Sequence, residues 1–189
     1  MGFQLEDGMG SGRSVHINDE NRIETESAIL TQFSKSSIVH GESFSWTAVS
    51  TDLAATLNLM YLANNSTAKH LRIHKIYVWS DVSTQFKIWL PSVYTAPNGT
   101  SVTGVNFNRT SGAVANATCT SGESTNTLVA NRVITTVRNN EVGTDQFGQW
   151  IDYGGSVVLG YHDSICVYGV ADSAAFEVTI LGYFHGKYE

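Results

Sequence analysis

The chain has 189 residues, of which 42% are hydrophobic and 11% aromatic, so it is long enough to build a sizeable core. Only 15% are charged, below the roughly 25% of an average globular protein, while the sequence contains 20 Ser, 19 Thr, 13 Asn and 17 Gly. This composition excludes a coiled coil or helical bundle, which depends on Glu, Lys, Arg, Ala and Leu. It indicates an all-β protein with long polar turns.

The balance of charge restricts the classes of partner. Eleven Lys and Arg against 17 Asp and Glu give a net charge of -6, without the basic surface that nucleic-acid binding requires. No run of 18 apolar residues is present, and the first residues lack the basic and apolar regions of a signal peptide. We therefore expect no nucleic-acid partner, no membrane insertion and folding in a reducing, intracellular compartment.

Residues 1–40 are predicted to form an extended N-terminal arm. The stretch Gly8–Arg13 is polar and rich in glycine, so it buries too little to fold alone and would order only when bound. Between residues 21 and 39 the pattern is ambiguous, because a few apolar positions could form a short helix face. The density of Thr and Ser there favours extended chain.

Strand patterns become regular after residue 41. Residues 43–47 alternate apolar and polar, and 57–63 form an apolar run typical of a strand buried on both faces. In residues 71–79, apolar residues occupy odd-numbered positions up to Ile73 and even-numbered positions from Ile76 onward. A strand can keep both sets on one face only if it contains an extra residue, which predicts a β-bulge near His74-Lys75. Residues 85–90 alternate again before Pro91 ends the strand.

The second half is polar at first and then returns to strand patterns. Residues 95–127 are dominated by small and polar residues, and short strands such as 102–108 are expected within them. Further strands are predicted at 128–137, 157–159, 164–170 and 176–184. Eight to ten strands without a long helix predict an antiparallel β-sandwich of jelly-roll type over residues 41–189.

No catalytic or metal-binding pattern stands out. His162-Asp163-Ser164 are adjacent in sequence, whereas a triad is assembled from separate elements. His70 and His74 would lie about 13 Å apart on a strand, too far for one metal ion, with Arg72 between them. We expect no enzymatic activity, no cofactor and no metal, although a calcium site built from loop carbonyls remains an alternative. Scattered carboxylates that match no EF-hand spacing are Glu141, Asp145, Asp152 and Asp163.

The two cysteines are predicted to be free thiols. Cys119 and Cys166 fit neither a zinc site nor a redox pair, and we expect Cys119 in a polar loop and Cys166 in a strand.

Outward-facing aromatic residues are the main candidates for contacts. Tyr77 and Trp79 alternate with apolar neighbours, so their side chains should point to the opposite face of the strand. Trp89 should likewise point to the face opposite that of Phe86, Ile88 and Leu90. Such residues indicate a second packed layer, a subunit interface or a glycan-stacking platform. We take Tyr77, Trp79 and Trp89 as candidates for a subunit interface and leave the other two interpretations open.

Several phrases of the sequence resemble a family of tailed-bacteriophage virion proteins across roughly residues 10–184. They are turn and strand phrases, not catalytic signatures: Gly12-Arg13-Ser14-Val15-His16-Ile17, Asn21-Arg22-Ile23-Glu24-Thr25, Leu59 to Asn65, Leu71-Arg72-Ile73, Ile76-Tyr77-Val78, Thr103-Gly104-Val105-Asn106-Phe107-Asn108, Gly154 to Gly160, and Val178 to Tyr183.

This resemblance implies a head decoration (cement) protein with a jelly-roll body, assembled in the bacterial cytoplasm and placed on the outer capsid surface as a homo-oligomer, commonly a trimer. The arm would contact the major capsid protein or a neighbouring protomer through Arg13, Val15, Ile17, Arg22 and Ile23. The alternative is a tail-associated or head-fibre jelly roll that binds host-surface glycans.

Overall fold

The computed structural model describes residues 32–53, 58–139, 148–170 and 174–186. Contacts divide the chain into two units, residues 1–30 and 31–189. The first unit, which holds most of the predicted arm, lies outside the described residues. The account below therefore concerns the second unit.

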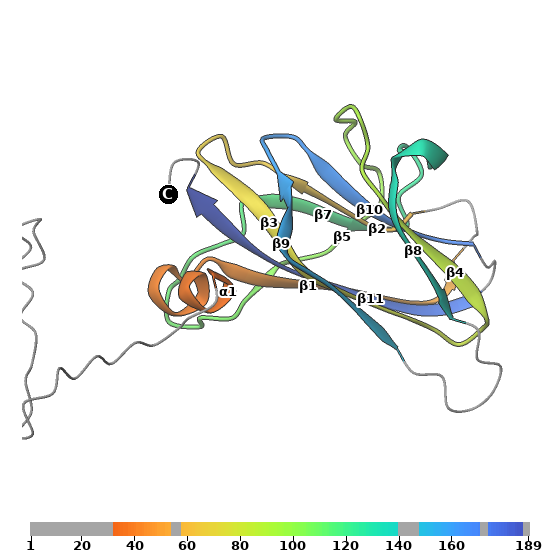
Figure 1. The fold of residues 1–189 in the computed structure, drawn as a ribbon, viewed down its shortest axis with the longest axis horizontal. Coiled ribbons are helices and arrows are strands. Elements are labelled where there is room, and N and C mark those ends of the chain that lie inside the picture. Colours follow the sequence, from red (N-terminus) through yellow and green to blue (C-terminus); the bar gives the residue numbers. More distant parts are fainter. Residues whose placement is uncertain (1–31, 54–57, 140–147, 171–173, 187–189) are drawn as a thin grey trace, which may run out of the picture. The chain divides into compact units, whose positions relative to one another are not determined.

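The second unit consists of two antiparallel sheets that pack face to face (Figure 1). The five-stranded sheet has the order β6-β1-β11-β3-β9, and the six-stranded sheet has the order β5-β7-β2-β10-β4-β8. The prediction of an all-β antiparallel sandwich is confirmed, with eleven strands among the described residues. Their bounds are β1 Ser43–Leu53, β2 Asn58–Asn64, β3 Lys69–Ser80, β4 Thr84–Trp89, β5 Thr100–Ser101, β6 Val105–Asn106, β7 Ala117–Ser121, β8 Val133–Asn139, β9 Gln149–Leu159, β10 Ser164–Gly169 and β11 Ala174–Gly186.

The core lies between the two sheets. Many of its side chains come from strands in which apolar and polar residues alternate. On β11, the buried residues Phe176, Val178, Ile180 and Phe184 face this core, as their shared parity predicts. All seven residues of β2 are buried. Strand β2 therefore has buried side chains on both faces, as its unbroken apolar run predicts.

The predicted β-bulge is confirmed at His74. The register of β3 shifts here against both neighbours, between Leu181 and Gly182 of β11 and between Ile73 and Lys75 on the β9 side. The extra residue restores the inward direction of the apolar side chains, so Ile73 and Ile76 are both fully buried.

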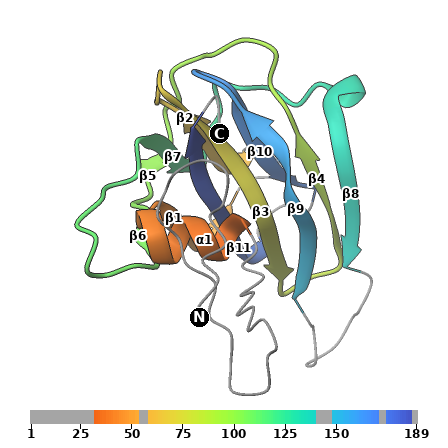
Figure 2. The ribbon, with the colours of Figure 1, turned by 60° about the vertical axis from the view of Figure 1, so that its left-hand side comes forward.

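Extended chain is the wrong prediction for residues 32–40, which form α1 (Gln32–Lys35) and the π-helical turn η1 (Ser36–His40). We call these residues the helical segment; it lies beside β1 and β11 (Figure 2). Gly41 ends it in the left-handed conformation, φ 63°, and donates its N–H to Ser36 O. The Ser36 hydroxyl donates to Phe184 O at 3.2 Å. These tertiary contacts outweigh the weak helix propensity of Ser.

The polar middle of the chain contains the short strands β5, β6 and β7, as expected. Cys119 lies in β7 instead of the expected loop, and both cysteines are free and buried. The strand expected at 102–108 is reduced to β6, and β8 begins only after the 3-10 turn η2 (Ala130–Arg132). In the described part of the chain, no helix has the length and apolar character needed to cross a membrane.

Candidate functional site: an aromatic face of the five-stranded sheet

The five-stranded sheet has a second face, directed away from the core, that carries large side chains. Because side chains alternate along a strand, burial of Ile76 and Val78 directs Tyr77 and Trp79 to this other face. The register places Trp150 of β9 directly opposite Tyr77. We call this surface the outer aromatic face and define it by Tyr77, Trp79, Trp150, Leu181 and Val49.

Tyr77 and Trp150 form the centre of the outer aromatic face. Their ring centroids are 5.2 Å apart at an interplanar angle of 46°, and Trp150 remains 54% exposed. Burial, and secondarily the charge of Glu177, raises the pKa of the Tyr77 hydroxyl. Gly148 leaves room for the ring of Tyr77, because a Cβ at position 148 would lie 2.0 Å from the Tyr77 hydroxyl oxygen. The pair is therefore a fixed, partly solvent-exposed aromatic surface.

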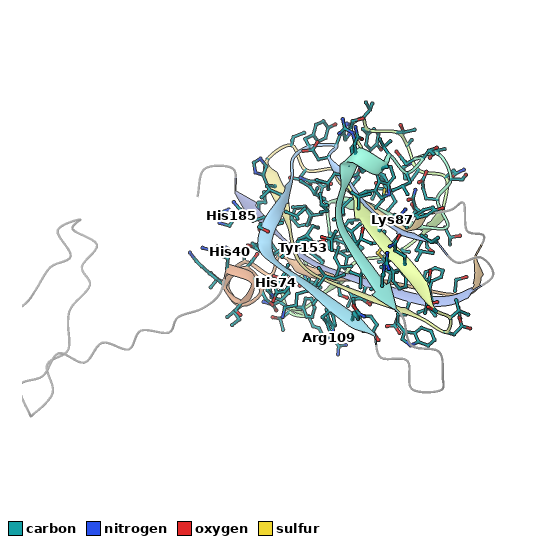
Figure 3. The ribbon with its side chains drawn as sticks, turned by 45° about the vertical axis from the view of Figure 1, so that its right-hand side comes forward. His40, His74, Lys87, Arg109, Tyr153 and His185 are labelled. Atoms are coloured by element: carbon teal, nitrogen blue, oxygen red, sulfur yellow. The ribbon has the colours of Figure 1, made fainter. Side chains whose placement is uncertain are left out.

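A hollow of about 340 Å³ adjoins this pair and is lined in part by Phe33, His74 and Phe107. The His74 ring, which the bulge places here (labelled in Figure 3), stacks on Phe33. Their ring centroids are 4.5 Å apart, with 20° between the planes. Phe33 also meets Phe107 edge-on at 5.5 Å. Burial lowers the pKa of His74 against the opposing effect of the Asp152 carboxylate. The helical segment thus closes one end of the outer aromatic face.

An ion pair borders the same hollow. Lys75 Nζ lies 3.1 Å from Asp152 Oδ2, and the Gly154 N–H donates to Asp152 Oδ1 at 2.9 Å. Hydrogen bonding to Lys75, and then to the Gly154 backbone, lowers the pKa of the Asp152 carboxyl. The outer aromatic face therefore presents aromatic rings beside fixed charges of both signs.

Of the three predicted interface residues, Tyr77 and Trp79 lie on the outer aromatic face, and the prediction for Trp89 is wrong. Trp89 is only 2% exposed and donates its Nε1–H to Asn58 Oδ1 at 3.2 Å. It packs with Tyr61 and Cys166 on the far side of the six-stranded sheet, where the partly buried Leu128, which precedes β8, packs against them. For Trp89, the interpretation as a second packed layer holds.

Residues 123–128, which we call the covering chain, are fastened to β2 by a buried carboxylate. Asn58 and Glu123 exchange backbone hydrogen bonds of 2.8 and 3.1 Å. The Glu123 side chain, 0% exposed, accepts bonds from Asn58 Nδ2 at 2.9 Å and Asn126 N at 2.9 Å, and from Thr125. This network connects β2 to the covering chain and so encloses Trp89.

The residues considered for catalysis are occupied with structural contacts. His162 stacks between Tyr94 and Tyr161, while the Asp163 carboxylate accepts the Gly160 N–H at 2.9 Å and Ser164 is buried. Within the described ranges, no group of three His, Cys, Asp or Glu side chains could hold a metal ion. Glu141 and Asp145 lie outside those ranges, as do the predicted arm contacts Arg13, Val15, Ile17, Arg22 and Ile23.

Sequence reasoning counted Trp150 among the aromatic residues of a possible sugar-stacking surface but did not place it beside Tyr77. The signal was present, because Trp150 and Asp152 alternate with Ile151 and Tyr153, but the strand was expected to start only at residue 157. Phe33 and Phe107 carried no comparable signal, since their contact depends on a helical turn and a loop meeting in space.

We compared the chain with protein-family models, curated proteins and solved structures, and none of them matches it.

Proposed function

We propose that the protein is a structural component of a tailed-phage particle that decorates and stabilises the capsid. Its N-terminal arm would contact the major capsid protein, and its outer aromatic face would contact another copy of the chain in a homotrimer. The observation that carries the proposal is the outer aromatic face, where Trp150 is 54% and Val49 68% exposed. Apolar and aromatic surface of this kind is typical of protein interfaces.

The sequence motifs that resemble phage virion proteins support the proposal that this assembly takes place on a phage particle. Symmetric closure makes a small ring of identical subunits a common solution for such a face. The low content of charged residues, 15%, also lessens the cost of removing water from a large contact area.

Two measurements test the proposal at the level of the particle and of the subunit. Capsids assembled without this protein should rupture at lower temperature or milder osmotic shock than complete capsids. The full chain should form a trimer by light scattering, and Trp150→Ala should shift it towards the monomer, since central aromatic residues contribute about 2 kcal/mol or more to an interface.

Tyr161→Ala is the matched control, because Tyr161 is 48% exposed and is not part of the outer aromatic face. Equal robustness of capsids with and without the protein, or its location in the tail, would contradict the decoration role. A trimer that tolerates Trp150→Ala would contradict the assigned interface.

The second candidate is a head-fibre or tail-associated protein that binds host glycans. The tilted Tyr77–Trp150 pair beside Lys75, Asp152 and Glu177 favours it, because sugars stack on aromatic rings and bond to flanking polar groups. Selective binding on a glycan array that is lost in Trp150→Ala, without loss of folding, would support this role over the first.

A further inference from the structure

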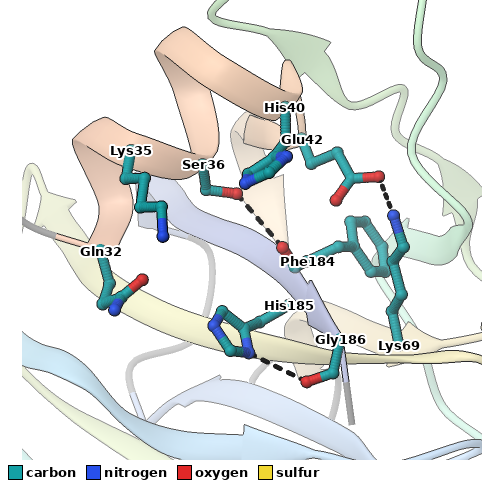
Figure 4. A pocket seen from close by; sticks show the side chains of 9 residues that line it. All are labelled: Gln32, Lys35, Ser36, His40, Glu42, Lys69, Phe184, His185 and Gly186. Carbon is teal, nitrogen blue, oxygen red and sulfur yellow. Dashed lines mark hydrogen bonds and ion pairs between the residues drawn. The ribbon is translucent and has the colours of Figure 1, made fainter. Parts of the chain in front are cut away.

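A second depression, which we call the basic pocket, lies where the helical segment meets the ends of β3 and β11. Its volume is about 280 Å³, and the residues that matter here are Lys35, His40, Glu42, Lys69, Phe184 and His185 (Figure 4). Phe184 belongs to the core and is 5% exposed, so the pocket has an apolar floor beneath a polar rim.

Basic side chains are concentrated in this pocket although the chain as a whole carries -6. The rim holds two lysines and two histidines against a single carboxylate, Glu42. That carboxylate is already bound by the Lys69 amine. Among the described residues, no carboxylate pairs with Lys35, His40 or His185, and Glu42 is the only described carboxylate that lines the pocket.

The geometry directs these groups inward. Figure 4 shows Lys35, His40 and His185 around the space between the helical segment and the end of β11. His185 Nδ1 lies 2.9 Å from Gly186 O, and because a carbonyl oxygen only accepts, Nδ1 carries a proton. The other ring nitrogen, Nε2, is left for a ligand and becomes a donor when the ring is protonated.

The pocket walls are held in place before any ligand arrives. Glu42 N donates to Ser36 O at 3.0 Å, and Phe184 N donates to Glu42 O at 3.0 Å. The Ser36 hydroxyl adds its bond to Phe184 O. Because the helical segment is fixed to β11 by these bonds, a ligand would lose little binding free energy to ordering the site.

We infer that the basic pocket binds a compact oxyanion, either a phosphate or a carboxylate group. Lysine and protonated histidine are point donors that form charge-assisted hydrogen bonds with both oxyanions. This inference does not depend on the proposed role in a phage particle, because it rests on the pocket and its charges alone.

The balance of positive and negative charge in the basic pocket depends on all the groups that face it. The described groups that contribute to this balance are Lys35 and His40 from the helical segment, Glu42 before β1, Lys69 and His70 at the start of β3, and His185 on β11. His70 lies directly opposite His185 in the β3–β11 register.

The test is a titration of the full chain with inorganic phosphate and, separately, with the tricarboxylate tricarballylate, by calorimetry at low ionic strength. We expect saturable binding of at least one probe. Histidine side-chain NMR signals should move together with the calorimetric titration. Binding of only one probe would support the site and identify its ligand as a phosphate or as a carboxylate.

Lys35→Gln is the informative variant because the Lys35 side chain is exposed and its loss should leave folding intact. It should weaken binding about tenfold, the effect of one charge-assisted hydrogen bond. Lys87→Gln is the matched control, with the same substitution on β4 of the other sheet (Figure 3). No saturable binding of either probe, or equal weakening by both variants, would overturn the inference.

Discussion

Removing the Glu123 carboxylate is the most direct test of what encloses Trp89. Glu123→Ala takes away the acceptor for Asn126 N at 2.9 Å and Asn126 Nδ2 at 3.2 Å, and both donors belong to a residue only 8% exposed. Asn58 Nδ2 keeps its bond to Asn126 O, and the exposed Thr125 donors can turn to water.

Two orphaned donors therefore set the expected loss. Each costs about 1–3 kcal/mol when buried without a partner, so Glu123→Ala should lower the free energy of unfolding by about 2–6 kcal/mol. Glu123→Gln keeps one acceptor oxygen for the Asn126 donors and loses mainly the bond from Asn58 Nδ2. Its cost should be about 1–3 kcal/mol.

Urea denaturation followed by tryptophan fluorescence measures these differences. Glu177→Ala is the control, because Glu177 lies on the solvent side of the five-stranded sheet, and it should change stability by no more than about 0.5 kcal/mol. If Glu123→Ala cost less than about 1 kcal/mol, or if Gln and Ala were equally costly, the buried network would not be what holds the covering chain.

Three further outcomes follow from burial. Trp89→Ala should lower the free energy of unfolding by about 3–5 kcal/mol and Trp150→Ala by less than about 1.5 kcal/mol, since only Trp89 is enclosed; equal losses in denaturation curves would contradict this. The pKa of His74 is lowered by burial, so the unfolded chain takes up the proton first. Melting temperature should therefore decline as pH drops below the ordinary histidine value of 6.5, and less steeply in His74→Gln; parallel curves would refute it. Cys119 and Cys166 should resist a thiol reagent until the chain unfolds, because both are buried and burial raises the pKa of each thiol; rapid native labelling would contradict this.

Local pattern was sufficient for much of the fold. The alternation of apolar and polar residues in β11 fits only a strand with one buried face. The change from odd-numbered to even-numbered apolar positions at His74 fits only a strand with a β-bulge. Both features could therefore be predicted from a few neighbouring residues. The alternation of side chains along β3 likewise predicted that Tyr77 and Trp79 lie on the outer face.

Long-range contacts account for what the sequence could not predict. Parity directed Trp89 away from the central core, but whether a second layer covers it depends on the Asn58–Glu123 bridge, whose members are 65 residues apart. The helical segment likewise depends on Phe184, 148 residues from Ser36. The residues around Trp89 and Ser36 in the sequence therefore do not indicate these distant partners.

The central position of β11 has a consequence for synthesis on the ribosome. In the five-stranded sheet β11 lies between β1 and β3, and the register pairs it with both along most of its length. While the chain is emerging, β1 and β3 have no common partner, so their inward apolar side chains wait for more than 90 further residues to be translated. The nascent chain therefore depends on late closure of this sheet, and chaperones that shield strand edges should affect the yield more than the rate of any local folding step.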